Sequence, residues 1–120
     1  MNTETRILIA ILVACCGPGL AARAGTPPHY HLARTIPVAG DDGWDLLSFD
    51  AVHARLFIAH GTRVQVIETR TFKAIGEIPD TAGVHGVALA TDLGRGYISA
   101  GRSNTVVVFD LKSLARLAEI

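Results

Sequence analysis

Histidine is the residue type of this chain best suited to metal binding or to general-base catalysis, and the chain contains five histidines. Protein metal sites draw their ligands from histidine, cysteine and carboxylate side chains, but no two of these histidines have the His-x-x-x-His spacing of a helical metal motif. His29 and His31 lie on one side of an extended segment, which is typical of a solvated approach to the first folded element. The fold must therefore bring the other histidines together if they form a site.

The serines, glycines and acidic residues show no catalytic or cofactor motif. No serine lies in a Gly-x-Ser-x-Gly turn. Gly94-x-Gly96 precedes a strand-like run and not a helix, which favours a tight turn over a phosphate site. Asp41-Asp42-Gly43 lacks the further acidic ligands of a calcium loop. The sequence therefore predicts no catalytic residue and no cofactor.

The composition is that of a folded chain without a surface for polyanions. Of its 120 residues, 49% are hydrophobic, which is too many for a disordered segment. Lysine and arginine number 11, as do aspartate and glutamate, so the formal net charge is +0 at pH 7. This balance gives no electrostatic footprint for nucleic acid or for an anionic membrane.

Residues 1–24 have the pattern of a signal peptide. Arg6 precedes the apolar run 7–16, and Ala22-Arg23-Ala24 forms a small-residue cleavage site. The apolar run is shorter than the about 20 residues that cross a bilayer, so no transmembrane span is expected in the mature chain. Cleavage after Ala24 would remove both cysteines and with them all thiol chemistry. We expect a periplasmic or secreted protein; in the alternative, residues 12–15 are a lipobox and the protein is a lipoprotein anchored at Cys15.

An internal repeat of about forty residues organises the rest of the chain. Residues 45–61 align with 85–101 without a gap, and 63–78 align with 105–120 after a two-residue insertion in the second copy. Seven of the 33 aligned positions are identical, and others keep side-chain size or charge, as Phe57 and Tyr97 do. This period is typical of a four-stranded unit that stacks on its neighbours.

Each copy divides into four short β-like runs separated by residues that favour turns. The expected strands lie at about 44–49, 55–59, 63–69 and 73–78, and again at about 85–89, 96–100, 105–109 and 115–120. The connections are short enough for hairpins, so each copy is expected to form an antiparallel meander.

Two segments allow more than one interpretation. The spacing of Leu111, Leu114 and Leu117 also fits a helix, but the aligned residues 72–78 contain Gly76 and β-branched residues, which favours a strand in both copies. Residues 30–37 share the Ile-Pro ending of 72–79 and are interpreted as an outer strand of a preceding unit.

Two hexapeptides carry a resemblance to a known family. Arg55-Leu56-Phe57-Ile58-Ala59-His60 and Arg95-Gly96-Tyr97-Ile98-Ser99-Ala100 are similar to the Arg-x-Tyr-Val-Thr-Asn core of YVTN repeats. Residues 64–68 and 106–110 resemble the strand that follows this core. Neither copy keeps the Thr-Asn ending, because His60 and Ala100 replace the asparagine. Over residues 30–120 the chain resembles the N-terminal part of a YVTN-repeat bacterial β-propeller protein.

The resemblance implies an all-β fold made of four-stranded antiparallel propeller blades. Residues 25–43 would be a lead-in with the outer strand of a preceding blade, residues 44–79 one blade and residues 80–120 another. Closed propellers have about 4–8 blades, so the expectation is an incomplete ring of about two blades plus one strand. A truncated chain whose remaining blades are missing is the simplest explanation, and self-association into a ring is the alternative.

The resemblance also implies a shared rim, because loops entering the first strand and loops joining the second to the third gather on one face of a propeller. His60, His85 and Asp45 are then candidate metal ligands, and Trp44, Arg102 and Asn104 are possible rim contacts. Histidine and aspartate in such turns also commonly satisfy loop backbone groups, so a structural role is the alternative for each.

The function expected from these patterns is that of an exported propeller scaffold which binds an unidentified protein or small ligand without turnover. The alternative is a propeller subunit of a periplasmic oxidoreductase, or a metal-dependent hydrolase that uses His60, Asp45 and His85. Because one architecture serves many activities, the fold alone does not decide between them.

Overall fold

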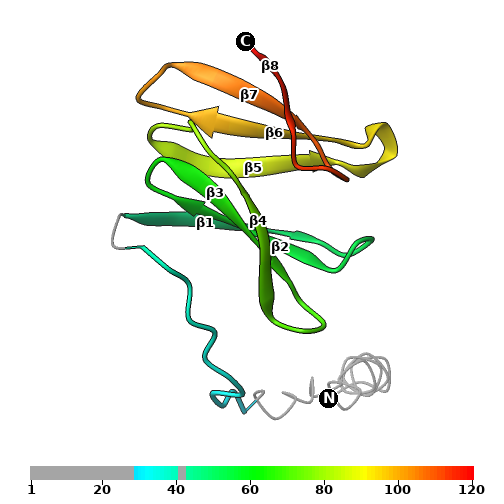
Figure 1. The fold of residues 1–120 in the computed structure, drawn as a ribbon. Coiled ribbons are helices and arrows are strands. Elements are labelled where there is room, and N and C mark those ends of the chain that lie inside the picture. Colours follow the sequence, from blue (N-terminus) through cyan, green and yellow to red (C-terminus); the bar gives the residue numbers. More distant parts are fainter. Residues whose placement is uncertain (1–28, 41–42) are drawn as a thin grey trace, which may run out of the picture. The chain divides into compact units, whose positions relative to one another are not determined.

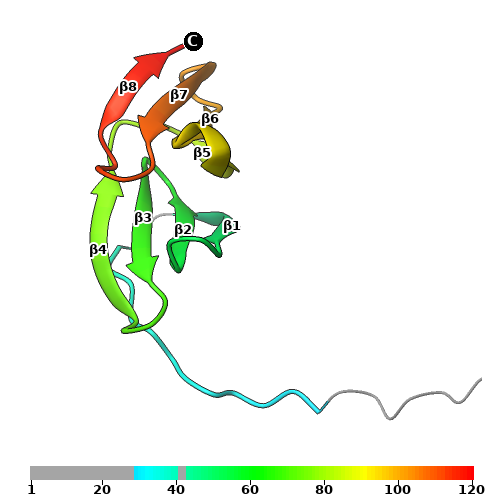
Figure 2. The same cartoon turned by 90° about the vertical axis from the view of Figure 1, so that its right-hand side faces the viewer.

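The protein is described by a computed structural model that covers residues 29–40 and 43–120. Within these residues the chain forms two four-stranded antiparallel sheets, each a meander in chain order (Figures 1 and 2). The first sheet has strands β1 (Trp44–Asp50), β2 (Arg55–His60), β3 (Arg63–Glu68) and β4 (Lys73–Ile78). The second has β5 (Val84–Ala90), β6 (Arg95–Ala100), β7 (Thr105–Asp110) and β8 (Arg116–Glu119), with a short 3-10 helix at Thr91–Leu93.

The expected all-β fold of two four-stranded meanders is confirmed. Each strand begins and ends within two residues of its expected bounds, and residues 116–119 form a strand rather than a helix. Residues 29–40 have no regular secondary structure, and the outer strand expected there stays a prediction. The signal peptide expected at residues 1–24 lies outside the described residues. No helix in the described residues is long and apolar enough to cross a membrane.

The two sheets repeat each other in detail. In the first sheet the register of β1 on β2 shifts between Trp44 and Leu47, and in the second sheet the register of β5 on β6 shifts between Val84 and Val87. The third and fourth strands shift between Val66 and Ile67, and correspondingly between Val108 and Phe109. A bulge adds one residue and increases the local twist, so equal bulges give the two sheets the same curvature.

An acidic residue at the end of the third strand shapes the next turn in both repeats. Glu68 accepts hydrogen bonds from the amides of Arg70 and Thr71 and from the Thr71 hydroxyl. Asp110 accepts the corresponding bonds from the amides of Lys112 and Ser113 and from the Ser113 hydroxyl. The recurring acid at this position therefore has a structural role, in which the side chain replaces a backbone acceptor of the turn.

Hydrogen bonding lowers the pKa of three carboxyl groups. The Thr71 hydroxyl and the turn amides lower the pKa of Glu68, and the Ser113 amide and hydroxyl lower that of Asp110. Burial raises the pKa of Asp50, but hydrogen bonds from the His53 ring and from the amides of His53 and Val52 outweigh burial and lower it. All three groups therefore favour the ionised form in the folded state.

We expect acid to destabilise the protein through these groups. Their folded-state pKa values lie below the unfolded values of about 4, so the unfolded state binds more protons as the pH falls. The stability that they contribute is complete above about pH 5 and is lost as the pH falls through the folded-state values. Urea unfolding at several pH values should show this loss, and Asp110→Asn should reduce it. A free energy of unfolding that rises below about pH 4 would contradict the prediction.

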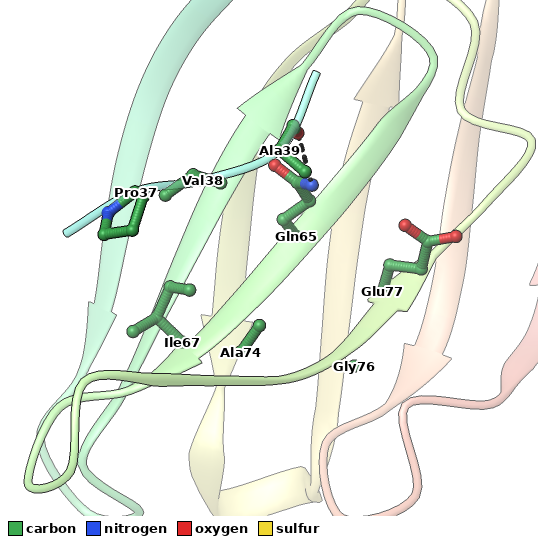
Figure 3. A pocket seen from close by; sticks show the side chains of 8 residues that line it. All are labelled: Pro37, Val38, Ala39, Gln65, Ile67, Ala74, Gly76 and Glu77. Carbon is green, nitrogen blue, oxygen red and sulfur yellow. Dashed lines mark hydrogen bonds between the residues drawn. The ribbon is translucent and has the colours of Figure 1, made fainter.

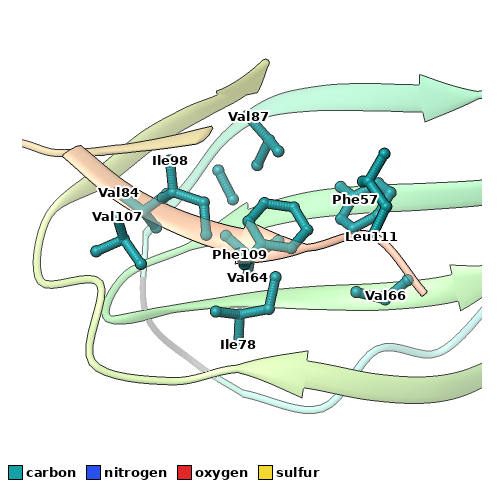
Figure 4. Packing of buried hydrophobic residues seen from close by; sticks show 11 residues of the cluster. Phe57, Val64, Val66, Ile78, Val84, Val87, Ile98, Val107, Phe109 and Leu111 are labelled. Carbon is teal, nitrogen blue, oxygen red and sulfur yellow. The ribbon is translucent and has the colours of Figure 1, made fainter. Parts of the chain in front are cut away.

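The hydrophobic core lies between the two sheets (Figure 4). The rings of Phe57 on β2 and Phe109 on β7 are fully buried, with centroids 5.6 Å apart and planes tilted by 46°. Val64, Val66 and Ile78 of the first sheet pack on Val84, Val87, Ile98, Val107 and Leu111 of the second. One face of each sheet is therefore covered by the other, and burial of these side chains stabilises the packing by about 25 cal/mol per Å² of apolar surface.

Two side-chain hydrogen bonds cross between the sheets at the margin of this core. The Arg55 guanidinium donates to the carbonyl of Leu111 at 2.5 Å, and the Ser48 hydroxyl donates to the carbonyl of Val87 at 2.5 Å. Both donors project from the inner face of the first sheet. The recurring Arg55 thus holds the neighbouring sheet through a backbone carbonyl.

Residues 34–40, here called the arm, lie across the opposite face of the first sheet (Figure 3). The Gln65 amide donates to the carbonyl of Ala39 at 2.9 Å, and the Arg34 guanidinium lies 4.6 Å above the ring centre of Phe72. Pro37, Val38 and Ala39 of the arm and Ile67 and Ala74 of the sheet enclose a cavity of about 380 Å³. The arm therefore covers the outer strands of this face without filling it.

Candidate functional site

A cavity of about 450 Å³ opens at one end of the two sheets. We call this end the rim; it is where β1 and β5 begin and where β2 and β6 turn into β3 and β7. Both repeats line the cavity, with Trp44 and Asp45 from the first and Val84, His85 and Arg102 from the second. Its volume lies within the about 300–1,000 Å³ of small-molecule sites.

A row of glycine backbone groups forms the floor of the rim cavity. The amide of Gly61 donates to the carbonyl of Gly43, the amide of Gly83 to Gly61, and the amide of Gly101 to Gly83, each at 2.9 Å. Gly43 and Gly83 are equivalent in the repeat, as are Gly61 and Gly101. A Cβ atom at Gly101 would lie 2.7 Å from Nε2 of His85, so a larger residue there would displace the imidazole. Backbone hydrogen bonds therefore hold the floor in place, and the cavity above it stays open because glycine has no side chain.

Asp45 and His85 form a hydrogen-bonded pair on the cavity wall. Nδ1 of His85 lies 2.8 Å from Oδ2 of Asp45, and the two residues occupy equivalent positions of the two repeats. Because the carboxylate accepts, Nδ1 of His85 donates, and Nε2 is the ring nitrogen left for a ligand. The structure thus brings together two of the three residues considered as metal ligands and fixes the orientation of the His85 ring.

His60 has a different environment from His85. Its ring is fully buried and stacks on the indole of Trp44, with centroids 3.6 Å apart and planes 10° apart. Nδ1 of His60 lies 3.0 Å from Oε1 of Gln65, whose amide nitrogen donates to Ala39 of the arm. Nε2 of His60 is buried without a hydrogen-bond partner. His60 therefore packs against the Trp44 indole of the rim and is linked through Gln65 to Ala39 of the arm.

Arg102 and Asn104, at and after the two-residue insertion, line different hollows. Arg102 lines the rim cavity, and its amide donates to the carbonyl of Ala82 at 3.0 Å. Asn104 takes the left-handed conformation, with φ of 55°, and its amide donates to the carbonyl of Gly101. Asn104 shapes the turn that presents Arg102, and it lines a different hollow, of about 230 Å³, together with Ile120.

Within residues 29–40 and 43–120, no three histidine, cysteine or acidic side chains gather as metal ligands would. Asp45 and His85 supply two donors, while Nδ1 of the third candidate, His60, faces Gln65. A metal at the rim therefore stays a prediction, to be tested by metal analysis.

Gln65 is the contributor that sequence reasoning missed. It stands in the apolar run Val64-Gln65-Val66-Ile67, and its equivalent in the second repeat is Val107. A polar residue at a position that is apolar in the other copy is the signal that could have identified it, because its amide needs hydrogen-bond partners that the strand itself does not supply.

Comparison with known proteins gives no further assignment: no protein-family model matches the chain, and no curated protein sequence matches it.

Proposed function

We propose that the protein is an exported repeat scaffold of the β-propeller kind that binds a small polar ligand at its rim. The proposal that it is exported rests on the signal-like residues 1–24, and the propeller assignment rests on the forty-residue repeat and the stacking of its two sheets. Further propeller blades or self-association would complete the ring. Binding without turnover is the activity that suits this site best.

The observation that carries the proposal is the pairing of Asp45 from one repeat with His85 from the other inside the rim cavity. A hydrogen bond between exposed side chains contributes little to stability, so its main effect is to hold Nε2 of His85 in place. Trp44 offers an aromatic surface that is 52% exposed beside it, and Arg102 adds a cationic group. A few oriented polar groups beside an aromatic ring are typical of small-ligand sites.

Thermal unfolding of residues 25–120 with a panel of sugars, amino acids and organic acids tests the proposal. A ligand at 100 times its dissociation constant should stabilise the fold by about 2.7 kcal/mol. Because Trp44 is the one tryptophan of the chain, its emission should change with the same ligand. The double variant His85→Asn/Arg102→Gln should lose both responses.

His53→Asn is the matched control, because His53 also pairs with an aspartate, Asp50, at 2.7 Å but in the turn after β1. This variant should keep the full ligand response. If no ligand of the panel stabilises the protein, or if the double variant and the wild type respond equally, the rim is not the binding site.

A metal-dependent hydrolase is the alternative, and the same Asp45–His85 pair favours it, since an oriented imidazole can serve as a base or a ligand. Metal analysis of the purified protein discriminates the two. We expect no stoichiometric metal that depends on these residues. One metal ion per chain that is lost in the His60→Ala/His85→Ala variant would contradict the scaffold and support the hydrolase.

A further inference from the structure

The outward face of β5–β8 exposes apolar side chains over a shallow groove. A hollow of about 370 Å³ is lined by Ala88, Tyr97, Ser99 and Val106 of this sheet together with Leu46 of β1. Val106 is 38% exposed and Ile120 is 80% exposed. Contiguous exposed apolar surface of this kind marks an interaction site more often than a free surface.

The outward face of β5–β8 is equivalent, in the repeat, to the face of β1–β4 that packs on the second sheet. Tyr97, Val106, Val108 and Ile120 align with Phe57, Val64, Val66 and Ile78, and all four of the latter are fully buried in the core. Arg95 aligns with Arg55, which donates to the carbonyl of Leu111 across the interface. The outward face of β5–β8 therefore presents the same surface that already binds a four-stranded sheet within this chain.

The outward face of β1–β4 presents the other half of the same interface. Leu47, Phe49 and Ile67 align with Val87, Leu89 and Phe109, which pack in or against the core between the sheets. Leu47 is 61% exposed and Phe49 is 60% exposed. The carbonyl of Thr69 aligns with that of Leu111 as an acceptor for the free guanidinium of Arg95. Each chain therefore carries both halves of one sheet-to-sheet interface on opposite faces.

We propose that the outward face of β5–β8 binds the outward face of β1–β4 of a second copy of this chain, in the register that joins the two sheets within one copy. Such a head-to-tail contact uses different surfaces on the two partners and closes into a ring when the rotation allows. Residues 25–120 contribute two sheets, so a ring of about 4–8 sheets made from this segment alone would hold about two to four copies. The proposal rests on the propeller architecture proposed above and is independent of the rim ligand.

The arm is the segment that must yield when the second copy binds. Arg34 and Ile36 of the arm align with Gly76 and Ile78 of β4. Arg34 contacts Phe72. In the same way Gly76 lies against Leu114, which is the equivalent of Phe72 in the second repeat. In the assembly, β8 of the neighbouring copy takes this place. Among the described residues, the polar contacts of the arm with this face are the hydrogen bond from Gln65 to Ala39 and the Arg34–Phe72 contact, whereas β8 is paired in a ladder with β7.

Sedimentation velocity of residues 25–120 tests the proposal, over about 1–100 µM protein. We expect the wild type to sediment as a dimer to tetramer. Leu47→Glu places a charge on one half of the interface and Val106→Glu on the other, and each variant alone should be a monomer. An equimolar mixture of the two should form a heterodimer, because each variant keeps the half that the other lacks.

Val52→Glu is the matched control, since Val52 is 67% exposed and lies in the turn between β1 and β2, outside the strands of both sheets. It should assemble as the wild type does, and circular dichroism should show that all three variants are folded. A monomeric wild type, or a mixture that stays monomeric, would overturn the proposal. The monomeric Leu47→Glu variant keeps the rim residues, so its ligand response tests the rim separately from the assembly.

Discussion

Replacing Phe57 or Phe109 by alanine is expected to lower the free energy of unfolding by about 3–5 kcal/mol in each case. Both rings are fully buried, and each fills the space that the other leaves between the sheets. A domain of this size has a total stability of about 5–15 kcal/mol, so either variant approaches the unfolding threshold. Urea unfolding followed by circular dichroism measures the loss.

The double variant Phe57→Ala/Phe109→Ala separates ring contact from simple burial. Tilted aromatic pairs contribute about 0.5–1.5 kcal/mol beyond their burial, so the double variant should lose less than the sum of the single losses by about this amount. Val52→Ala, at an exposed apolar side chain in the turn after β1, should change stability by about 0.5 kcal/mol or less. Equal losses at Val52 and Phe109 would show that the two sheets do not stack on each other.

Gly96→Leu is expected to destabilise the protein by about 3 kcal/mol, because its neighbour across the strands leaves no room. A Cβ atom at Gly96 would lie 2.1 Å from Cζ and 2.2 Å from Cε1 of Phe109, a rigid ring that cannot move aside alone. The equivalent cross-strand pair in the first sheet is Leu56 with Ile67. The first repeat therefore pairs two side chains of similar size, Leu56 and Ile67, whereas the second repeat pairs Gly96, which has no side chain, with the large ring of Phe109.

Transferring the first repeat's pair tests this compensation. Phe109→Ile alone removes the ring and leaves a cavity, which costs stability. The double variant Gly96→Leu/Phe109→Ile recreates the Leu56 and Ile67 pair and should be more stable than Gly96→Leu alone. Chemical denaturation of the three variants measures the interaction. Losses that simply add would contradict structural equivalence of the two repeats.

Much of the fold could be predicted from the sequence because its determinants are local. Strand positions follow from short β-branched and aromatic runs between turn residues. Where the pattern of one copy fits both a helix and a strand, the aligned segment of the other copy decides between them. Residues 111–120 have helix-like spacing when taken alone, yet the alignment of 114–120 with 72–78 correctly indicated the strand at Arg116–Glu119. A repeat supplies two independent samples of one local structure, which is why the strand bounds agree closely.

The site could be predicted only in part, because its contacts depend on cross-strand register. The repeat placed Asp45 and His85 at equivalent positions near one rim, and the structure brings them into contact. The stacking of Trp44 on His60 follows from their pairing across β1 and β2 beside a bulge, which counting alternate residues does not reveal. The role of Gln65 depends on the arm, whose path has no local sequence signal.

We propose that this scaffold binds its ligand at the rim formed by both repeats, and amide chemical-shift mapping by NMR distinguishes the rim from every other surface of the protein. With the ligand found by thermal unfolding, we predict that the amides of Gly43, Gly61, Gly83 and Gly101 and the Trp44 indole shift together. Residues of the opposite turns, such as His53 and Ser113, should stay unchanged. Shifts confined to those turns, or to one repeat alone, would show that the ligand does not bind at a rim shared by both repeats.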